Sequence, residues 1–129
     1  MQIDSIDHLV LTVKDVERTC VFYESVLGFE VITFGDGRKA LRFGKQKLNL
    51  HQQGREFEPK AAAPTPGAID LCFISETPID TVRRELNEKD VPVEEGPVER
   101  TGAVGRLVSV YLRDPDRNLI EIANYIQEG

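Results

Sequence analysis

Residues 6–13 have the sequence IDHLVLTV, an almost wholly apolar and largely β-branched run that is interrupted by His8. This composition predicts a strand buried on both faces. Apolar residues then recur at three- and four-residue spacing over 16–27, which predicts a helix. Asp15 can cap the start of that helix, and Gly28 can end it in the left-handed conformation. The fold therefore opens with a strand followed directly by a helix.

Three further strands follow the first helix, and the tight Gly-Asp-Gly turn at 35–37 separates the first two of them. They are predicted at 29–34, 39–43 and 47–52. Residues 55–67 carry three prolines and show no apolar period, which is typical of a linker.

The same order of elements recurs after the linker. A strand is predicted at 68–74, and a helix begins after Thr77 as N-cap with Pro78 at the first helical position. Three more strands are predicted at 91–94, 107–112 and 119–124. We therefore predict an α+β fold made of two tandem βαβββ modules within one domain. Module one covers 3–53, the linker 54–67 and module two 68–125, and we expect the two open sheets to share an interior.

Composition excludes several classes of protein. The 129 residues suit one domain whose core needs neither metal nor disulfides. The net charge is −6 and no Lys/Arg run is present, so we expect no nucleic-acid partner. No apolar run is long enough for a membrane span, and the first residues lack signal-peptide features, which predicts a cytoplasmic location. Cys20 and Cys72 form no paired motif and are expected to be reduced packing residues.

The chain contains only two histidines, His8 and His51. When the modules are aligned, His8 matches Asp70 and His51 matches Glu121. Two imidazoles and one or two carboxylates suit a divalent first-row transition metal with positions left open for a substrate. We therefore predict one metal ion, nickel, zinc, cobalt, manganese or iron, bound by His8, His51 and Glu121, with Asp70 as fourth ligand or base. The alternative is that these side chains are satisfied core residues.

Strand alternation predicts which side chains lie beside the histidines. Thr12 shares a face with His8, while Asn49 and Gln53 share one with His51. These three residues are predicted to line a small, mostly apolar pocket that suits a small-molecule substrate.

Three residues of module two are further candidates. Tyr111 is a possible proton donor, and Arg100 or Arg106, beside the glycine-containing loop 101–105, is positioned to meet an anionic substrate. The alternatives are core packing for the tyrosine and solvation for the arginines.

The whole chain resembles the vicinal oxygen chelate superfamily of glyoxalases, extradiol dioxygenases, fosfomycin-resistance proteins and bleomycin-binding proteins. The resemblance is carried by residues 7–13 with Asp15, 22–23, 26–29, 114–116 and 118–121. Residues 34–41, 48–51 and 58–60 look like the branch called glyoxalase domain-containing protein 5.

The resemblance implies a cup-shaped mixed sheet with the helices outside and a metal held by the first and last strands of each module, which are the four positions named above. It also implies a homodimer. The function it favours is a glyoxalase-type lyase or isomerase that acts on a small substrate with vicinal oxygens. There the metal stabilises a developing oxyanion as a Lewis acid, and Glu121 or Asp70 moves the proton.

Two departures from the family pattern bear on the reaction. Extradiol dioxygenases and fosfomycin-modifying members have histidine where this chain has Asp70, which disfavours both. Arg117 stands where the turn usually has glycine, and a positive φ there costs on the order of 1 kcal/mol. The remaining alternatives are an extradiol-type dioxygenase and a metal-free, bleomycin-resistance-like binding protein.

Overall fold

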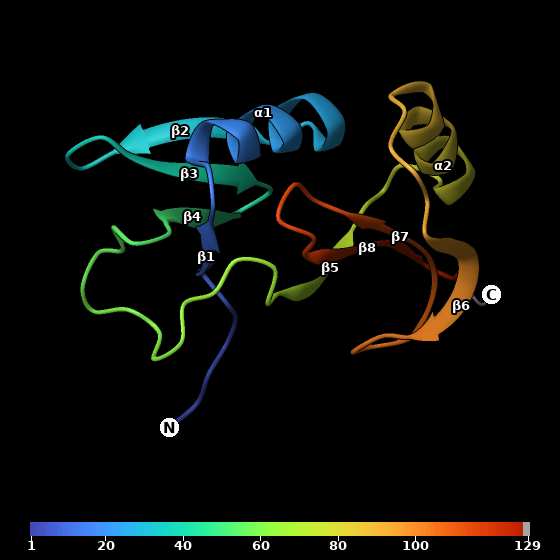
Figure 1. Cartoon of the computed structure of the whole chain (residues 1–129). Coiled ribbons are helices and arrows are strands. Elements are labelled where there is room, and N and C mark those ends of the chain that lie inside the picture. Colours follow the sequence, from blue (N-terminus) through green and yellow to red (C-terminus); the bar gives the residue numbers. More distant parts are fainter. Residues whose placement is uncertain (128–129) are drawn as a thin grey trace. The chain divides into compact units, whose positions relative to one another are not determined.

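The computed structural model describes residues 1–127 and divides into two compact units, unit 1 (Met1–Ala68) and unit 2 (from Ile69 onward). Each unit contains a strand, a helix and three strands in that order (Figure 1), which confirms the predicted βαβββ repeat. The elements of unit 1 are β1 (His8–Val13), α1 (Val16–Leu27), β2 (Glu30–Phe34), β3 (Arg38–Phe43) and β4 (Gln46–Gln52). Those of unit 2 are β5 (Asp70–Ile74), α2 (Ile79–Glu88), β6 (Glu95–Thr101), β7 (Arg106–Arg113) and β8 (Leu119–Tyr125).

Each unit forms one four-stranded mixed sheet. The strand orders are β1-β4-β3-β2 and β5-β8-β7-β6, so the first strand of a unit lies at the sheet edge and pairs in parallel with the last strand. The other pairs are antiparallel. Parallel strands need a crossover connection, and the helix together with β2 and β3 supplies it in unit 1.

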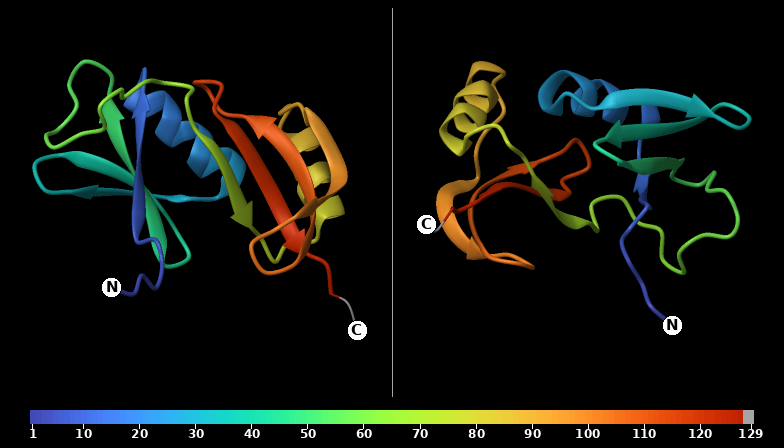
Figure 2. Two further views of the ribbon diagram at one scale, coloured as in Figure 1. Left: turned by 90° about the horizontal axis from the view of Figure 1, so that it is seen from below. Right: turned by 180° about the vertical axis from the view of Figure 1, so that it is seen from behind.

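One face of each sheet packs against the helix of the same unit (Figure 2). In unit 1 the buried residues Leu11, Val13, Leu48 and Leu50 lie on this face, with Tyr23 of α1 among them. In unit 2 the apolar stripe of α2 is formed by the buried residues Ile79, Val82 and Leu86. Neither helix of residues 1–127 is long and apolar enough to cross a membrane.

The prediction that the first strand is buried on both faces is wrong for its first half. His8, Leu9 and Val10 are exposed, and burial begins at Leu11. The reason is that β1 has a neighbouring strand on one side only and a helix on one face only.

The helices begin at side-chain amides that come from the last strand of the same unit. In unit 1, Gln52 Oε1 accepts the Val16 N–H at 3.2 Å, and its Nε2 donates to the Lys14 carbonyl. In unit 2, Asn124 Oδ1 accepts the Ile79 N–H at 2.7 Å. These contacts satisfy helix N–H groups that have no intrahelical partner. Asp15 caps α1 as predicted, through the Arg18 N–H at 3.2 Å.

Thr77 is not the N-cap of α2, contrary to the prediction. Pro78 holds that position and offers no side-chain cap bond, because proline has no polar side chain. Asn124 replaces the missing cap: besides accepting the Ile79 N–H, its Nδ2 donates to the carbonyls of Ser75 and Thr77 at 2.8 and 2.9 Å.

The sixth strand lies at Glu95–Thr101, not at 91–94 as predicted. The strand contains Gly96 and Pro97, a pair that is more typical of a turn. However, β6 is an edge strand, where proline removes no essential ladder bond. Gly96 has φ +111°, and a Cβ on it would lie 2.3 Å from the Ser109 carbonyl oxygen, so this irregular part of the ladder requires glycine.

The clamp formed by Asn124 yields a stability prediction. Asn124→Ala removes three hydrogen bonds and leaves the Ile79 N–H without its partner, so we expect the free energy of unfolding to fall by about 2–3 kcal/mol. The matched control is Asn87→Ala on the exposed side of α2, which should change it by less than about 0.5 kcal/mol. Urea denaturation followed by circular dichroism measures both values, and equal effects would contradict the clamp.

Candidate active site

Unit 2 contains a cavity of about 450 Å³ on the sheet face opposite α2. It is bordered by β5, β7 and β8 and by the loop that follows β6. Its lining residues are Cys72, Ile74, Arg100, Thr101, Gly102, Ala103, Leu107, Tyr111, Glu121 and Tyr125. Three of the residues predicted from the sequence therefore line one cavity: Arg100, Tyr111 and Glu121.

A row of reactive side chains crosses three neighbouring strands in this cavity. Tyr111 of β7 pairs with Glu121 of β8, which pairs with Cys72 of β5. Directly paired residues project to the same face of a sheet. Arg100 Nε donates to the Tyr111 hydroxyl oxygen at 3.0 Å, and its Nη2 lies 3.2 Å from a Glu95 carboxylate oxygen. The hydroxyl oxygen of Tyr111 thus has a fixed cationic donor, while its own O–H can donate to the neighbouring Glu121 carboxylate.

The electrostatics of this row keep its acidic protons in place. Burial raises the pKa of Tyr111, and the negative charge of Glu121 raises it further, against the opposing effect of Arg100. Neighbouring protein atoms remove part of the water around the Cys72 sulfur, and this desolvation, with the negative charges of Glu121 and Asp70, raises the pKa of its thiol to about 11. Tyr111 is therefore a proton donor at neutral pH, and Cys72 is a thiol, not a thiolate nucleophile. Cys72 is exposed, so its assignment as a core packing residue is wrong; Cys20 is partly buried.

Asp70 lies on the same face as Glu121, two residues away along the ladder, because its partner in β8 is Leu119. The backbone before Asp70 is fixed by Asn118, whose Oδ1 accepts the Ile69 N–H at 2.9 Å. Asn118 is 1% exposed, and Asp114 accepts both its backbone and its side-chain N–H. This buried network positions the strand that carries Asp70 against the strand that carries Glu121.

The ladders also revise the alignment of the two modules. Gln52 and Asn124 make equivalent contacts to the two helix starts, and His8 and Asp70 begin equivalent strands. With these pairs aligned, Asn49 occupies the position of Glu121, and His51 matches Ala123. The matching of His51 with Glu121 in the sequence is therefore off by two residues.

The same register separates the two histidines. His8 pairs with Lys47, and His51 lies four residues further along β4, about 13 Å at about 3.3 Å per residue. His8 is exposed, with Nδ1 2.8 Å from Asp7. Among residues 1–127, no group of three or more His, Cys, Asp or Glu side chains lies close enough to hold a metal ion.

The other predicted substrate-binding residues lie in different surroundings. Thr12 and Asn49 lie on the face of the unit 1 sheet opposite α1, since they pair with His51 and Val10. Gln53 is exposed beyond the end of β4. Arg106 is exposed, forms an ion pair with Glu99, and does not line the cavity.

Sequence reasoning did not identify Cys72 or Arg38 as site residues. Cys72 follows Asp70 by two positions, so strand alternation could have placed it on the face of Asp70. Arg38 gave no local signal, because its surroundings depend on Phe57, which follows β4 in the sequence: the Arg38 guanidinium carbon lies 4.2 Å from the centre of the Phe57 ring.

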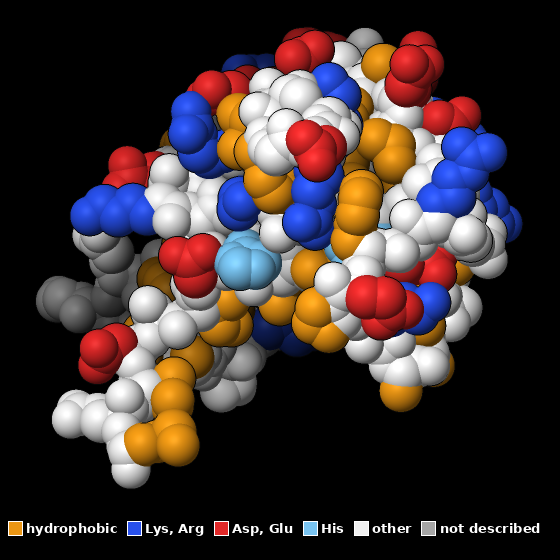
Figure 3. Space-filling view, turned by 90° about the vertical axis from the view of Figure 1, so that its left-hand side faces the viewer, with side chains coloured by type: hydrophobic (Ala, Val, Ile, Leu, Met, Phe, Trp, Pro, Cys, Tyr) orange, Lys and Arg blue, Asp and Glu red, His pale blue; other side chains and the backbone are white. Residues whose placement is uncertain are grey.

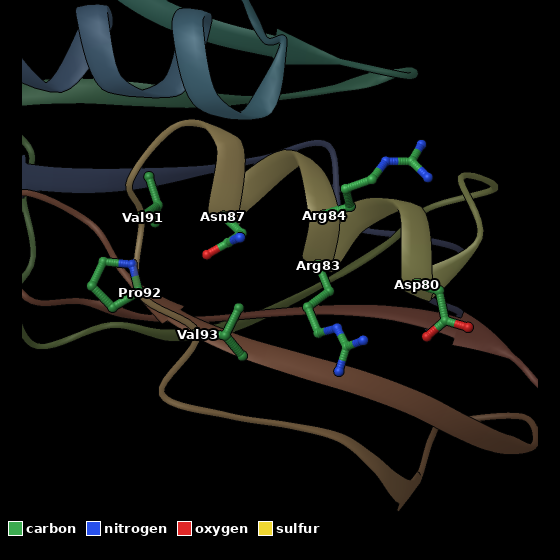
Figure 4. Close-up of a pocket in the computed structure, with 7 residues that line it drawn as sticks. All are labelled: Asp80, Arg83, Arg84, Asn87, Val91, Pro92 and Val93. Atoms are coloured by element: carbon green, nitrogen blue, oxygen red, sulfur yellow. The ribbon is translucent and has the colours of Figure 1, made fainter.

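Exposed hydrophobic side chains gather between charged ones in Figure 3, and several belong to unit 1. In unit 1, the large hydrophobic side chains that are more than a third exposed include Ile6, Leu9, Val10 and Phe57. A second hollow, of about 680 Å³, lies between α2 and the segment 91–93 in unit 2 (Figure 4). Its polar lining residues are Asp80, Arg83, Arg84 and Asn87, and all of them are exposed or half-exposed helix side chains without a buried acid or nucleophile.

Two curated proteins show close similarity to this chain. Virulence protein STM3117 of Salmonella typhimurium is 61% identical over 126 residues, which cover 98% of this chain and 88% of the relative. Glyoxalase domain-containing protein RDO1 of Mycosarcoma maydis is 54% identical over 125 residues, which cover 97% of this chain and 70% of the relative.

Several solved structures have the same fold as this chain. The crystal structure of the Salmonella protein has a TM-score of 0.97, with 98% of this chain and all of the other covered. Lactoylglutathione lyase from Agrobacterium tumefaciens (23% identity, TM-score 0.72, 96% of each chain) shares the fold. So does TnmS3, an antibiotic-binding protein from a Streptomyces species (22% identity, TM-score 0.74, 98% of this chain and 99% of the other).

The family model of the Glyoxalase/Bleomycin resistance protein/Dioxygenase superfamily matches residues 5–122. This match spans both βαβββ units and agrees with the resemblance stated above. The chain therefore belongs to the glyoxalase/bleomycin resistance protein/dioxygenase superfamily.

Proposed function

We propose that the protein is a divalent-metal-dependent enzyme of glyoxalase type, a lyase or isomerase that acts on a small substrate with two neighbouring oxygens. The observation that supports this most is the row of Arg100, Tyr111 and Glu121 in the cavity of unit 2. It combines a carboxylate, which can take a proton, with a phenol that can give one.

The roles of these residues follow from their surroundings. Glu121 acts as the general base. Tyr111 keeps its proton because burial raises its pKa, and it donates a hydrogen bond or the proton to a substrate oxygen as charge develops there. Arg100 orients the phenol through the 3.0 Å bond from its Nε. The side chains of Ile74 and Leu107 give the cavity an apolar part beside these polar groups.

The donor set of unit 2 partly fits a divalent ion. Asp70 and Glu121 lie on one face of adjacent strands two residues apart, a spacing at which two carboxylates can share one cation. We propose these two side chains of unit 2 as ligands of the ion. The ion would act as a Lewis acid toward the substrate oxygens.

A second candidate function is small-molecule binding without a metal. The observation that favours it is that no group of three ligand-type side chains comes together within residues 1–127. Such a protein would use the same cavity to enclose its ligand, with Tyr111 and Arg100 as polar contacts.

Metal content separates the two functions. Tag-free protein that has never met a chelating resin should contain about one transition metal ion per chain by inductively coupled plasma mass spectrometry. Asp70→Asn and Glu121→Gln should lose the ion, while the exposed control Asp80→Asn should keep it. Nickel or zinc would direct assays to lyase substrates, and iron to catechols. Protein that stays metal-free after reconstitution with each ion would overturn the enzyme proposal in favour of the binding protein.

The thiol of Cys72 reports on the neighbouring carboxylates in metal-free protein. With a pKa of about 11, on the order of one thiol in a thousand is ionised at pH 8, so alkylation by iodoacetamide should be slow. Glu121→Gln removes a charge that raises this pKa, so the Cys72 pKa should fall and alkylation should become several-fold faster. The rate at Cys20, read from the same peptide mass spectra, should not change. An unchanged rate at Cys72 would show that Glu121 does not face this thiol.

A further inference from the structure

We propose that unit 1 carries a binding subsite for a small hydroxy acid, formed by Arg38, Lys47, Asn49 and His51 on the sheet face opposite α1. In this subsite the two cations and His51 bind the carboxylate, and Asn49 accepts a hydrogen bond from the hydroxyl. This inference adds a substrate class to the proposed function. Binding of the acid does not depend on that function, but its role as a substrate does.

Two buried polar side chains on β4 lack partners. Asn49 is 7% exposed and His51 is 3% exposed, and they lie two residues apart on the same face. Asn49 Oδ1 and His51 Nε2 are both buried and have no hydrogen-bond partner in the described structure. A buried polar atom without a partner costs about 1–3 kcal/mol. Such a cost is understandable when a ligand supplies the missing hydrogen bonds.

The segment that follows β4 covers this face. In Figures 1 and 2 it lies on the side of the sheet opposite α1. Its Phe57 meets His51 edge to face, with the ring centroids 5.5 Å apart, and is itself 42% exposed. His51 is therefore shielded from bulk water by one partly exposed aromatic residue.

Two cations converge on the same aromatic rings. The guanidinium carbon of Arg38 lies 4.2 Å from the centre of the Phe57 ring and 5.3 Å from that of Phe34. Lys47 Nζ lies 3.9 Å from the centre of the Phe34 ring. Stacking on aromatic faces holds a guanidinium in place while its N–H edges remain available.

Among residues 1–127, neither cation forms an ion pair with a carboxylate, although the chain has a net charge of −6. Other basic side chains in this part of the chain do form ion pairs with glutamates, for example those of Arg42, Arg106 and Arg113. Within residues 1–127, the Arg38 guanidinium stacks on Phe57 and Phe34, and the Lys47 ammonium lies over Phe34. An available guanidinium fork and ammonium suit a carboxylate.

The polar atoms of β4 refine the ligand class. A neutral imidazole can donate through Nε2 to a carboxylate oxygen, whereas Asn49 Oδ1 is an acceptor and requires a donor. A hydroxyl group beside a carboxylate supplies both functions within one small molecule. Inorganic phosphate would also meet the cations and keeps a P–OH donor at neutral pH, so the titration compares it directly with a hydroxy acid.

The test is a titration of the full chain, kept metal-free with EDTA, with glycolate, acetate or inorganic phosphate. Binding is monitored by NMR through the signals of the Arg38 Nε–H and the Asn49 side-chain amide. Glycolate should give saturable shifts and bind more tightly than acetate or phosphate. Arg38→Gln should weaken glycolate binding at least about tenfold. Arg42→Gln, on the same strand face but paired with Glu30, should change it by less than about twofold.

Asn49→Leu separates a binding role from a structural one. It replaces an unpartnered amide by an apolar side chain of similar size, so Tm should stay the same or rise by a few degrees, while the preference for glycolate over acetate disappears. The proposal is overturned if no saturable shift occurs, if Arg42→Gln and Arg38→Gln act alike, if phosphate binds as tightly as glycolate, or if Asn49→Leu lowers Tm. None of these measurements needs turnover or a metal ion. A negative result would therefore overturn the subsite alone, whereas the metal content of Glu121→Gln tests the proposed function.

Discussion

The parallel pairing of the first and last strands within each unit is the constraint on which the rest of this structure depends. Parallel neighbours cannot be joined by a tight turn, so the intervening chain must cross over, and the helix that covers one sheet face is part of that crossover. The amides of Gln52 and Asn124 join the end of the last strand to the start of the helix in both units. One interaction thus sets the strand register and the helix position together.

This register determines the chemistry available on each open sheet face. In unit 2 it brings Glu121 beside Cys72 and Tyr111, so that its carboxylate helps to raise the pKa of both the thiol and the phenol. In unit 1 the equivalent position is Asn49, and the face carries unpaired cations stacked on aromatic rings instead. The open faces of the two modules therefore differ in the residue types they carry, with Glu121 in unit 2 where unit 1 has Asn49.

Much of the fold was predictable because it rests on local signals. Apolar periods of two and of three to four residues, with Asp15, Gly28 and the 35–37 turn as boundaries, located nearly all strands and both helices. The errors occurred where a tertiary neighbour replaced a local signal. Asn124 supplies the cap that Thr77 was expected to provide, and the edge position of β6 tolerates Pro97.

The sequence by itself determined the duplicated βαβββ order, the superfamily, and the presence of Arg100, Tyr111 and Glu121 among the polar candidates, because hydrophobic period and residue type are local properties of the chain. Only the tertiary structure decided which candidates meet. Whether His51 matches Glu121 or Ala123 depends on a two-residue shift between strands, which the repeat spacing cannot show. Likewise, the burial of Asn49 and His51 and the stacking of Arg38 on Phe57 arise from residues distant in sequence.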